Sequence, residues 1–376
     1  MATTSRHLSH IKMPKQHFKV CFCFRRMFRL KVADEPPDEI DILFKEYSQH
    51  GIMSMDDLCD FLVQFQGEEE GVAIKKHAQT IFDSLRHLNI FHRRGLHVEA
   101  FFRYLLSDLN VPLAEVHHDM NFPLAHYFLY TGHNSYLTGN QVSSASSTSA
   151  IIKALKKGVR VIELDLWPNS RGDDVLVHHG GFTQKNLLRI YPKGTRLNSS
   201  NYDPMIGWMH GAQMVAFNMQ GGGHHLRYME GIFGANGGCG YVKKPDILLN
   251  VGPNNEVFDP RAIRPVQKIL QVLVYMGEGW RSDFGPTHFD FYSPPDFRVQ
   301  VGIRGVPDDK DTKYSRTIED DWVPVWNEEF SFPLTVPELA LFYIKVVERD
   351  FSGRHDFGGQ TCLPVSELRQ GIRAVR

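Results

Sequence analysis

Hydrophobic residues in the first third of the chain recur at helical spacing. From Glu39 to Leu106 the apolar positions lie three and four residues apart, as at Ile40, Leu43 and Phe44. This spacing places apolar side chains on one face of a helix. It predicts a set of amphipathic helices over 33–110, separated by short turns that are centred on glycine.

Two of these turns have the helix, glycine turn, helix pattern of EF-hands, in which glycine is the sixth residue of a twelve-residue calcium loop. Centring the first loop on Gly51 gives the ligand positions Glu46, Ser48, His50 and Asp57. Centring the second loop on Gly95 places Phe101 where the bidentate glutamate is required. Calcium needs six to eight oxygen ligands. We therefore interpret both loops as structural helix connections, with calcium binding as the weaker alternative.

Strand and helix patterns alternate in the middle of the chain. The segments HYFLYTG, VRVIELDLW and DDVLVHHGG are predicted strands, and STSAIIKALKKG is a predicted helix between the first two. LLRIYPKG, GAQMVAFNMQ and GGCGYVKKPDIL continue the pattern. Alternation of this kind is typical of a parallel α/β sheet.

The hydrophobic period changes to two from about residue 270. LQVLVYM, FRVQVGI, FSFPLTV and LFYIKVV alternate between apolar and polar positions and are separated by loops rich in Pro, Gly and Asp. This pattern predicts an antiparallel β-sandwich over 265–376.

Charge is balanced overall but uneven along the chain. There are 42 Lys and Arg residues against 43 Asp and Glu, a balance that argues against nucleic-acid binding. Residues 1–32 carry eight basic side chains and no acidic one, interleaved with phenylalanines. This segment suits an anionic lipid surface, and a solvated basic tail is the alternative. Five scattered cysteines, and no apolar run of 18 residues, indicate an intracellular protein without a membrane span.

Polar side chains lie at the ends of three predicted strands. They are His133 and Asn134, Glu163 and Asp165, and His178 and His179. Functional groups of an α/β barrel project from the carboxyl ends of its strands. Glu163 and Asp165 lie two apart, hence on one face of a strand, and two buried carboxylates need a cation. Together these groups predict an acid/base pair around calcium or magnesium.

The motifs resemble those of eukaryotic phosphoinositide-specific phospholipase C. TGHNSYLTGNQ, VIELDLW and VHHGG are similar to its X region, and LLRIYPKGTRLNSSNYDPMIGWMHGAQMVAFNMQ and ANGGCGYVKKPDIL to its Y region. The helices resemble its EF-hand-like segment, and the sandwich resembles its C2 domain. Without a pleckstrin domain in front, the arrangement is most similar to the plant enzymes. The resemblance implies a multidomain fold of EF-hand-like helices, a (β/α) TIM-type barrel and a C2 sandwich.

The resemblance also implies an activity, the calcium-dependent hydrolysis of phosphatidylinositol 4,5-bisphosphate to inositol 1,4,5-trisphosphate and diacylglycerol. In that mechanism His133 stabilises the phosphorane, and His179 protonates the diacylglycerol oxygen and then activates water. Asn134, Glu163 and Asp165 hold the calcium, which lowers the pKa of the inositol 2-hydroxyl. Glu163 is also the candidate base for that hydroxyl. His178 is the less favoured histidine because the glycine must follow directly.

Further roles follow from the same resemblance. Arg189 is implied as a ligand of a ring phosphate, and Tyr191 as a residue that packs against the inositol ring. In the sandwich, the implied calcium ligands are Asp296, Glu348, Asp350 and Asp356. Solvated acidic loops are the alternative for these four carboxylates.

The chain departs from the family between its X and Y regions. HHGG at 178–181 runs directly into FTQKNLLRIYP, which divides the barrel into a truncated X half (120–181) and a truncated Y half (182–248). A complete eight-stranded barrel needs about 250 residues, so the barrel is incomplete, and a fourth acidic calcium ligand and ring-phosphate lysines are lost with the missing part. The sandwich also stops short of the family's final strand.

Two functions remain open at this point. The first is a phosphoinositide phospholipase C. The second is a catalytically impaired splice or gene-model variant that acts only as a calcium-dependent membrane-binding module. In either case we expect a monomer, in the cytoplasm and peripheral on the plasma membrane, that binds anionic phosphoinositide membranes and no nucleic acid.

Overall fold

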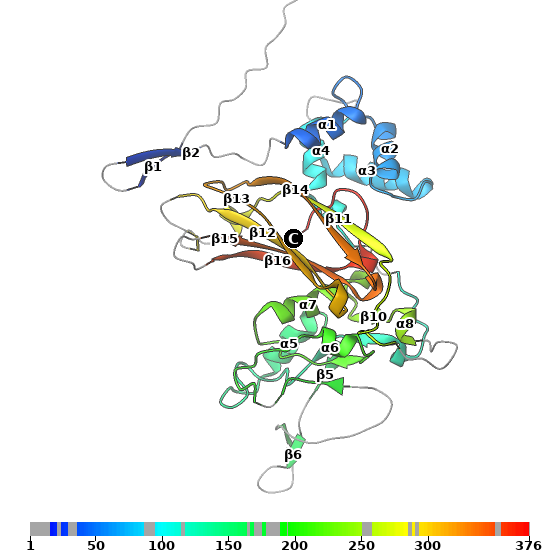
Figure 1. Ribbon diagram of the computed structural model, residues 1–376, viewed down its shortest axis with the longest axis vertical. Helices are drawn as coiled ribbons and strands as arrows, with labels where there is room; N and C mark the ends of the chain where they lie inside the picture. The colour runs from blue at the N-terminus through cyan, green and yellow to red at the C-terminus, as the bar shows by residue number, and fades with distance from the viewer. Residues whose placement is uncertain are drawn as a thin grey trace, which may run out of the picture.

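A computed structural model of the chain describes residues 16–20, 24–28, 36–85, 95–113, 117–163, 166–168, 175–177, 189–193, 195–249, 258–284, 288–289, 293–349 and 355–375. The C-terminal sandwich lies between a helical region and an α/β region (Figure 1). Near the N-terminus, β1 (Gln16–Val20) and β2 (Phe24–Phe28) pair as an antiparallel hairpin. The lipid-binding role expected of 1–32 stays a prediction.

The predicted helical region is confirmed. Its elements are α1 (Asp38–Glu46), α2 (Met55–Gln64), α3 (Val72–Leu85), α4 (Val98–Leu105) and the 3-10 turn η1 (Asp108–Asn110). The two glycine turns pair with each other, because the backbones of Met53 and Leu96 exchange hydrogen bonds of 2.9 and 2.8 Å. Asp57, a ligand position of the first loop, instead caps α2. Its carboxylate accepts from the Ser54 N–H (2.8 Å), and its own N–H donates to the Ser54 hydroxyl (3.2 Å).

Residues 120–249, called the half barrel from here on, form the α/β region. Its elements are η2 (Leu124–His126), β3 (Tyr127–Leu129), β4 (Thr131–Gly132), α5 (Thr148–Lys156), β5 (Val161–Ile162), β8 (Arg189–Ile190), α6 (Met205–Trp208), β9 (Met214–Val215), α7 (His224–Ile232), η3 (Asn236–Gly238), β10 (Tyr241–Lys243) and α8 (Asp246–Leu249). β4 pairs in parallel with β5, and β8 with β9. A parallel bridge between Gly132 and Phe217 joins the two pairs. The strand order is therefore β5, β4, β9, β8, and the predicted parallel sheet is confirmed for these strands.

Two expected parallel strands are antiparallel instead. β6 (Leu166–Pro168) pairs antiparallel with β7 (Val175–Val177) in a separate hairpin. Only six residues connect them, whereas a parallel crossover needs a dozen or more. β10 pairs antiparallel with β3. It lies along β3 on the side that β5 takes along β4, because the Tyr130 N–H donates to the Gly240 carbonyl while the Tyr130 carbonyl accepts from the Val161 N–H.

The sandwich has the predicted antiparallel architecture. Its strands are β11 (Lys268–Met276), β12 (Phe297–Arg304), β13 (Asp311–Ile318), β14 (Val325–Leu334), β15 (Leu341–Glu348) and β16 (Phe357–Pro364), with the short helical elements α9 (Trp280–Asp283), η4 (Pro307–Asp309), η5 (Pro337–Leu339) and η6 (Val365–Glu367). One sheet has the order β13, β12, β15, β16, and β11 pairs with β14 in the other. The period of two indicated four of these strands. It missed β13 and β16, whose sequences are mostly polar or rich in glycine.

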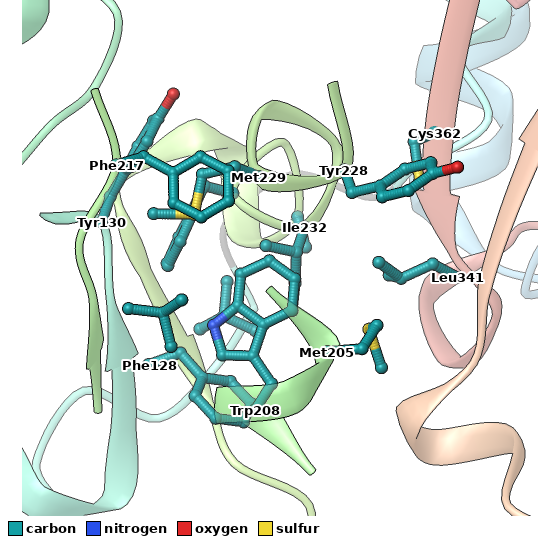
Figure 2. Packing of buried hydrophobic residues seen from close by; sticks show 14 of the residues in the cluster. Phe128, Tyr130, Met205, Trp208, Phe217, Tyr228, Met229, Ile232, Leu341 and Cys362 are labelled. Atoms are coloured by element: carbon teal, nitrogen blue, oxygen red, sulfur yellow. The ribbon is translucent and has the colours of Figure 1, made fainter. Parts of the chain in front are cut away.

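The half barrel and the sandwich share one hydrophobic core. Phe128 and Trp208 of the half barrel belong to the same buried cluster as Leu341 and Cys362 of the sandwich, and Figure 2 shows these side chains converging from both sides. α7 approaches β16 so closely that a Cβ on Gly231 would lie 2.5 Å from the Cys362 carbonyl oxygen. Burial of apolar area at this contact stabilises both partners.

Candidate active site

His133 is buried at the end of β4. Its side chain is 3% exposed, and its Nδ1 lies 2.9 Å from the Asn218 Oδ1. The same Oδ1 accepts from the Gln141 Nε2 (3.0 Å). Because that oxygen accepts both bonds, the network assigns the Nδ1 proton to His133. Nε2 is then the ring nitrogen that can gain or lose a proton.

Asn134 follows in a left-handed backbone conformation, with φ of 44°, which asparagine tolerates better than most residues. Its Nδ2 donates to the Gln141 Oε1 (3.0 Å). Its Oδ1 accepts a longer bond from the Tyr136 hydroxyl (3.3 Å). Asn134 and His133 are thereby tied to one amide network.

Glu163 and Arg189 come from the two outer strands of the sheet. Glu163 directly follows β5, and Arg189 begins β8. The Arg189 guanidinium donates to the Glu163 Oε1 in a charge-assisted pair. The other carboxylate oxygen of Glu163, Oε2, is buried and has no hydrogen-bond partner within the described ranges. A buried acceptor of this kind can bind a proton or a cation.

Tyr191 connects the arginine to the histidine. Its ring stacks on His133 with a centroid distance of 5.9 Å and an interplanar angle of 4°. The Arg189 guanidinium lies 4.8 Å from the centre of the same ring, a cation–π geometry. The tyrosine is 41% exposed, so part of it is open to a ligand.

The structure therefore brings together five of the residues selected from the sequence. They are His133, Asn134, Glu163, Arg189 and Tyr191. Asp165 and His179, along with His178, lie outside the described residues. Sequence reasoning missed Asn218 and Gln141, the two amides that organise the site. Both fall inside motifs used for the resemblance, GNQ and FNMQ, but nothing in the pattern of apolar positions distinguishes them.

The predicted ligands of the sandwich gather at one end of its main sheet. Asp296 precedes β12, Glu348 ends β15, and Asp356 precedes β16. The Glu348 N–H donates to the Asp356 carbonyl (2.9 Å). The Asp296 carboxylate accepts from the N–H of Asp320, a further acidic residue that the sequence did not indicate. Asp350 lies outside the described residues, and calcium binding here stays a prediction.

A third group of side chains lies where the residues just before the half barrel meet the sandwich. His117 and His118 each place Nε2 against the Glu367 carboxylate, at 2.6 and 3.0 Å. The bond from His118 is the main reason why the pKa of Glu367 is lowered. Within the described ranges these are the only three His, Cys, Asp or Glu residues grouped closely enough to hold a metal.

Tautomer chemistry argues against a metal in that group. The His118 Nδ1 accepts from the Lys243 N–H (3.2 Å), so the proton of a neutral ring resides on Nε2. A metal on Nε2 would displace this proton to Nδ1 and abolish the bond from Lys243. We therefore interpret the group as a set of structural hydrogen bonds that holds the sandwich against the preceding domain.

Comparison with known sequences now defines the class of protein. The sequence model described as "Phosphatidylinositol-specific phospholipase C, Y domain" matches residues 143–247. The model for the C2 domain matches 268–375, and "Phosphoinositide-specific phospholipase C, efhand-like" matches 36–111. EF-hand-like helices, a catalytic-type α/β region and a C2 sandwich thus follow one another in the order predicted.

Complete relatives identify the family. The chain is 39% identical to Phosphoinositide phospholipase C 2 of Arabidopsis thaliana, with 96% of each chain covered. It is equally identical to Phosphoinositide phospholipase C 1 of the same plant, again with 96% of each chain covered. The chain belongs to the phosphoinositide-specific phospholipase C family and is of the plant type.

The same comparison reveals the internal gap. The alignment with the first relative extends over 563 positions, whereas this chain has 376 residues. At least 187 positions, the difference between the two, therefore face no residue of this chain.

Solved structures agree on the fold. A crystal structure of PLC21 from L. pealei superposes with a TM-score of 0.68 at 19% identity, over 88% of this chain and 65% of that one. PLC21 from S. officinalis gives a TM-score of 0.69 at 18% identity, over 89% and 65%. The chain thus spans slightly under two thirds of these structures.

Two general properties can be stated beside family membership. A C2 domain is consistent with calcium binding and with peripheral association with a membrane. Among the described residues, no helix is both long enough and apolar enough to cross a bilayer.

Proposed function

We propose that this protein is a phosphoinositide phospholipase C that hydrolyses phosphatidylinositol 4,5-bisphosphate to inositol 1,4,5-trisphosphate and diacylglycerol. The relatives are named phosphoinositide phospholipase C, which supports the reaction class. The observation that carries the proposal is the buried His133, oriented by the Asn218 amide and stacked on Tyr191. A histidine held in one tautomer at a strand end is suited to proton transfer or charge stabilisation.

The role of His133 follows from its partner. The Nδ1–H bond to the Asn218 carbonyl oxygen is retained when Nε2 is protonated, so the amide stabilises the imidazolium form. The protonated ring can then donate from Nε2 to a phosphoryl oxygen whose charge increases during attack. Because Gln141 bonds to the same oxygen, the Asn218 amide is held in place before substrate binds.

Arg189 and Tyr191 are suited to the inositol headgroup. The guanidinium provides a planar array of donors for phosphate, and it retains donors beyond the one used by Glu163. The exposed part of the Tyr191 ring offers an apolar surface beside it. We assign ring-phosphate binding to Arg189 and contact with the inositol ring to Tyr191.

The donor set in the half barrel is compatible with calcium. The Asn134 amide oxygen and the Glu163 carboxylate are hard oxygen ligands, and the buried Glu163 Oε2 is not otherwise bonded among the described residues. With Asp165, these side chains would hold the ion. Bound calcium would lower the pKa of the inositol 2-hydroxyl. We assign acceptance of the proton of that hydroxyl to Glu163, and leaving-group protonation to His179.

A second function rests on the ion pair itself. Arg189 already neutralises Glu163 without any metal ion, as in a site that has no further catalytic use. The protein would then act as a calcium-dependent membrane-binding module, with Asp296, Glu348, Asp350 and Asp356 as its ligands. Both functions place the protein in the cytoplasm and on the inner surface of the plasma membrane, where anionic phosphoinositides lie.

The test is release of inositol phosphate from vesicles of phosphatidylcholine that contain labelled phosphatidylinositol 4,5-bisphosphate, with calcium or with chelator. We expect calcium-dependent release by the full chain and a loss of at least about 100-fold in His133→Ala, which removes general acid/base chemistry. His210→Ala is the matched control, because His210 is an exposed histidine on the same half barrel.

Vesicle sedimentation in the same samples separates the two functions. No release by the full chain, alongside calcium-dependent sedimentation that Asp296→Asn weakens, would establish the membrane-binding module. Equal release by the full chain and His133→Ala would refute the catalytic role of this histidine.

A further inference from the structure

The parallel sheet of the half barrel ends in two unpaired strands. Within the described part of the chain, β5 pairs only with β4, and β8 pairs only with β9. Strands at a sheet edge present backbone donors and acceptors to any further strand. A parallel (β/α) barrel closes with eight strands and has no edges. Four strands are therefore half of the number that closure requires.

The two edges carry opposite charges at neighbouring positions. Glu163 directly follows β5, and Arg189 lies in β8. In the single chain these side chains reach each other across the open side of the sheet and form an ion pair. The edges thus already attract each other, but no described strand fills the space between them.

A second copy of this chain fits these edges. A two-fold axis along the barrel would keep all strands parallel, and it would place β5 of one copy beside β8 of the other. The ring would then run β5, β4, β9, β8 twice. Both of its seams would be the same, and each would set a glutamate beside an arginine.

Exposed apolar side chains flank the same edges. On α5, the helix that leads into β5, Ile152 is 52% exposed and Leu155 45%. On α6, Gly207 packs against Ile190 of β8, and the adjacent Ile206 is 57% exposed. Each seam would therefore bring apolar residues of one copy toward those of the other. In Figure 1, β5 is labelled on the side of the half barrel that lies away from the sandwich.

We propose that two copies of this chain associate through β5 and β8 to close one eight-stranded barrel. In this dimer, Glu163 of each copy pairs with Arg189 of the other copy, instead of with Arg189 of its own chain. This replaces the monomer expected from the sequence. It also makes each site composite, with Glu163 from one copy and Arg189 from its partner, and it is independent of whether the site is catalytic.

The test is sedimentation equilibrium of the full chain and of two charge reversals, Glu163→Arg and Arg189→Glu. We expect the unaltered chain to have twice the mass of one chain. Each reversal alone sets like charges at both seams and is expected to weaken association at least tenfold.

An equimolar mixture of the two variants is the discriminating sample. In a mixed pair, both seams again join opposite charges, so the mass should return to that of two chains. An ion pair within one chain cannot be restored by mixing. A mixture that stays at the mass of one chain would overturn the proposal. So would an unaltered chain of single mass at about 50 μM, where a Kd of about 1 μM would leave most chains paired.

A second set of variants applies if a charge reversal fails to fold, as judged by far-ultraviolet circular dichroism. Ile206→Asp keeps both charges and places a carboxylate at the seam, so it should weaken association at least tenfold. Ile269→Asp is the matched control, because Ile269 is an equally exposed isoleucine on the sandwich. An unchanged mass for Ile206→Asp, or loss of the dimer in Ile269→Asp alone, would place the contact elsewhere and overturn the proposal.

Discussion

The sandwich and the half barrel achieve order by different means. Strands of the sandwich are eight to ten residues long and pair along nearly their whole length. Strands of the half barrel that pair in parallel are two residues long. The half barrel nevertheless keeps a buried histidine and a connected amide network. A site can therefore be held by side-chain hydrogen bonds and core packing where little sheet remains.

The short strands of the half barrel are compensated by its packing against the sandwich. Trp208 of the half barrel and Trp326 of the sandwich are both about 1% exposed, yet they belong to different clusters. The cluster around Trp208 contains sandwich residues, whereas the cluster around Trp326 lies entirely within residues 270–368. The half barrel depends on the sandwich for its core, and the sandwich depends less on the half barrel.

The largest expected effect comes from removing either tryptophan. Trp208→Ala and Trp326→Ala should each cost about 3–5 kcal/mol, the usual loss for a large buried side chain. Because the half barrel borrows sandwich residues, Trp326→Ala should lower the urea midpoint of both regions. Trp208→Ala should lower that of the half barrel more. Urea unfolding followed by circular dichroism and by fluorescence measures both midpoints. If each substitution lowered only the midpoint of its own region, the shared core would be contradicted.

A smaller loss is expected from Gly231→Leu at the contact between α7 and β16. The new side chain would start 2.5 Å from the Cys362 carbonyl oxygen, so the helix must move away from the strand. Overpacking of this kind costs about 1–3 kcal/mol. Gly222→Ala is the control, since a Cβ there meets no atom within 4 Å, and it should change the unfolding free energy by less than about 0.5 kcal/mol. Equal changes in the unfolding free energy for the two variants would show that α7 and β16 are not closely packed at Gly231.

The remaining expected effect is a gain of stability at Lys244, next to β10. Burial lowers the pKa of this lysine to about 8, and its Nζ lies 6.0 Å from the centre of the Phe128 ring. Each pKa unit is worth about 1.4 kcal/mol, which sets a limit of roughly 3 kcal/mol. Loss of the cation–π contact takes back about 1 kcal/mol, so Lys244→Met should stabilise the fold by about 2 kcal/mol at pH 7.

The pH dependence of the unfolding free energy tests this prediction. Between about pH 8 and 10.4 the unfolded lysine holds a proton that the folded one has lost. The unfolding free energy of the unaltered chain should therefore rise with pH across this window, and the advantage of Lys244→Met should disappear above it. Urea titrations at pH 7, 9 and 10.5 measure the difference, with Lys243→Met as the neighbouring control. A constant difference at all three values would refute burial as the cause.

Sequence patterns predicted the architecture better than the pairing of strands. Periods of 3.6 and 2 correctly located the helices and four sandwich strands because those elements bury one face. The direction of β7 and β10 could not be read from their apolar residues, since parallel and antiparallel strands share the same local pattern. At the site, motif resemblance selected His133, Glu163 and Arg189, which the structure brings together around Tyr191. It could not indicate that Glu163 would pair with Arg189, which depends on two edge strands curling toward each other.

The contact between Gly231 and Cys362 also sets an order in time. Synthesis proceeds from the N-terminus, and domains generally fold as they emerge. Leu341, Tyr343 and Cys362, which belong to the same core as Trp208, lie in the last two strands of the sandwich, at least 133 positions later in the chain. The half barrel therefore stays partly folded until β16 has been synthesised. Its apolar surfaces are exposed to chaperones throughout that interval, and any pause of the ribosome within the sandwich lengthens it.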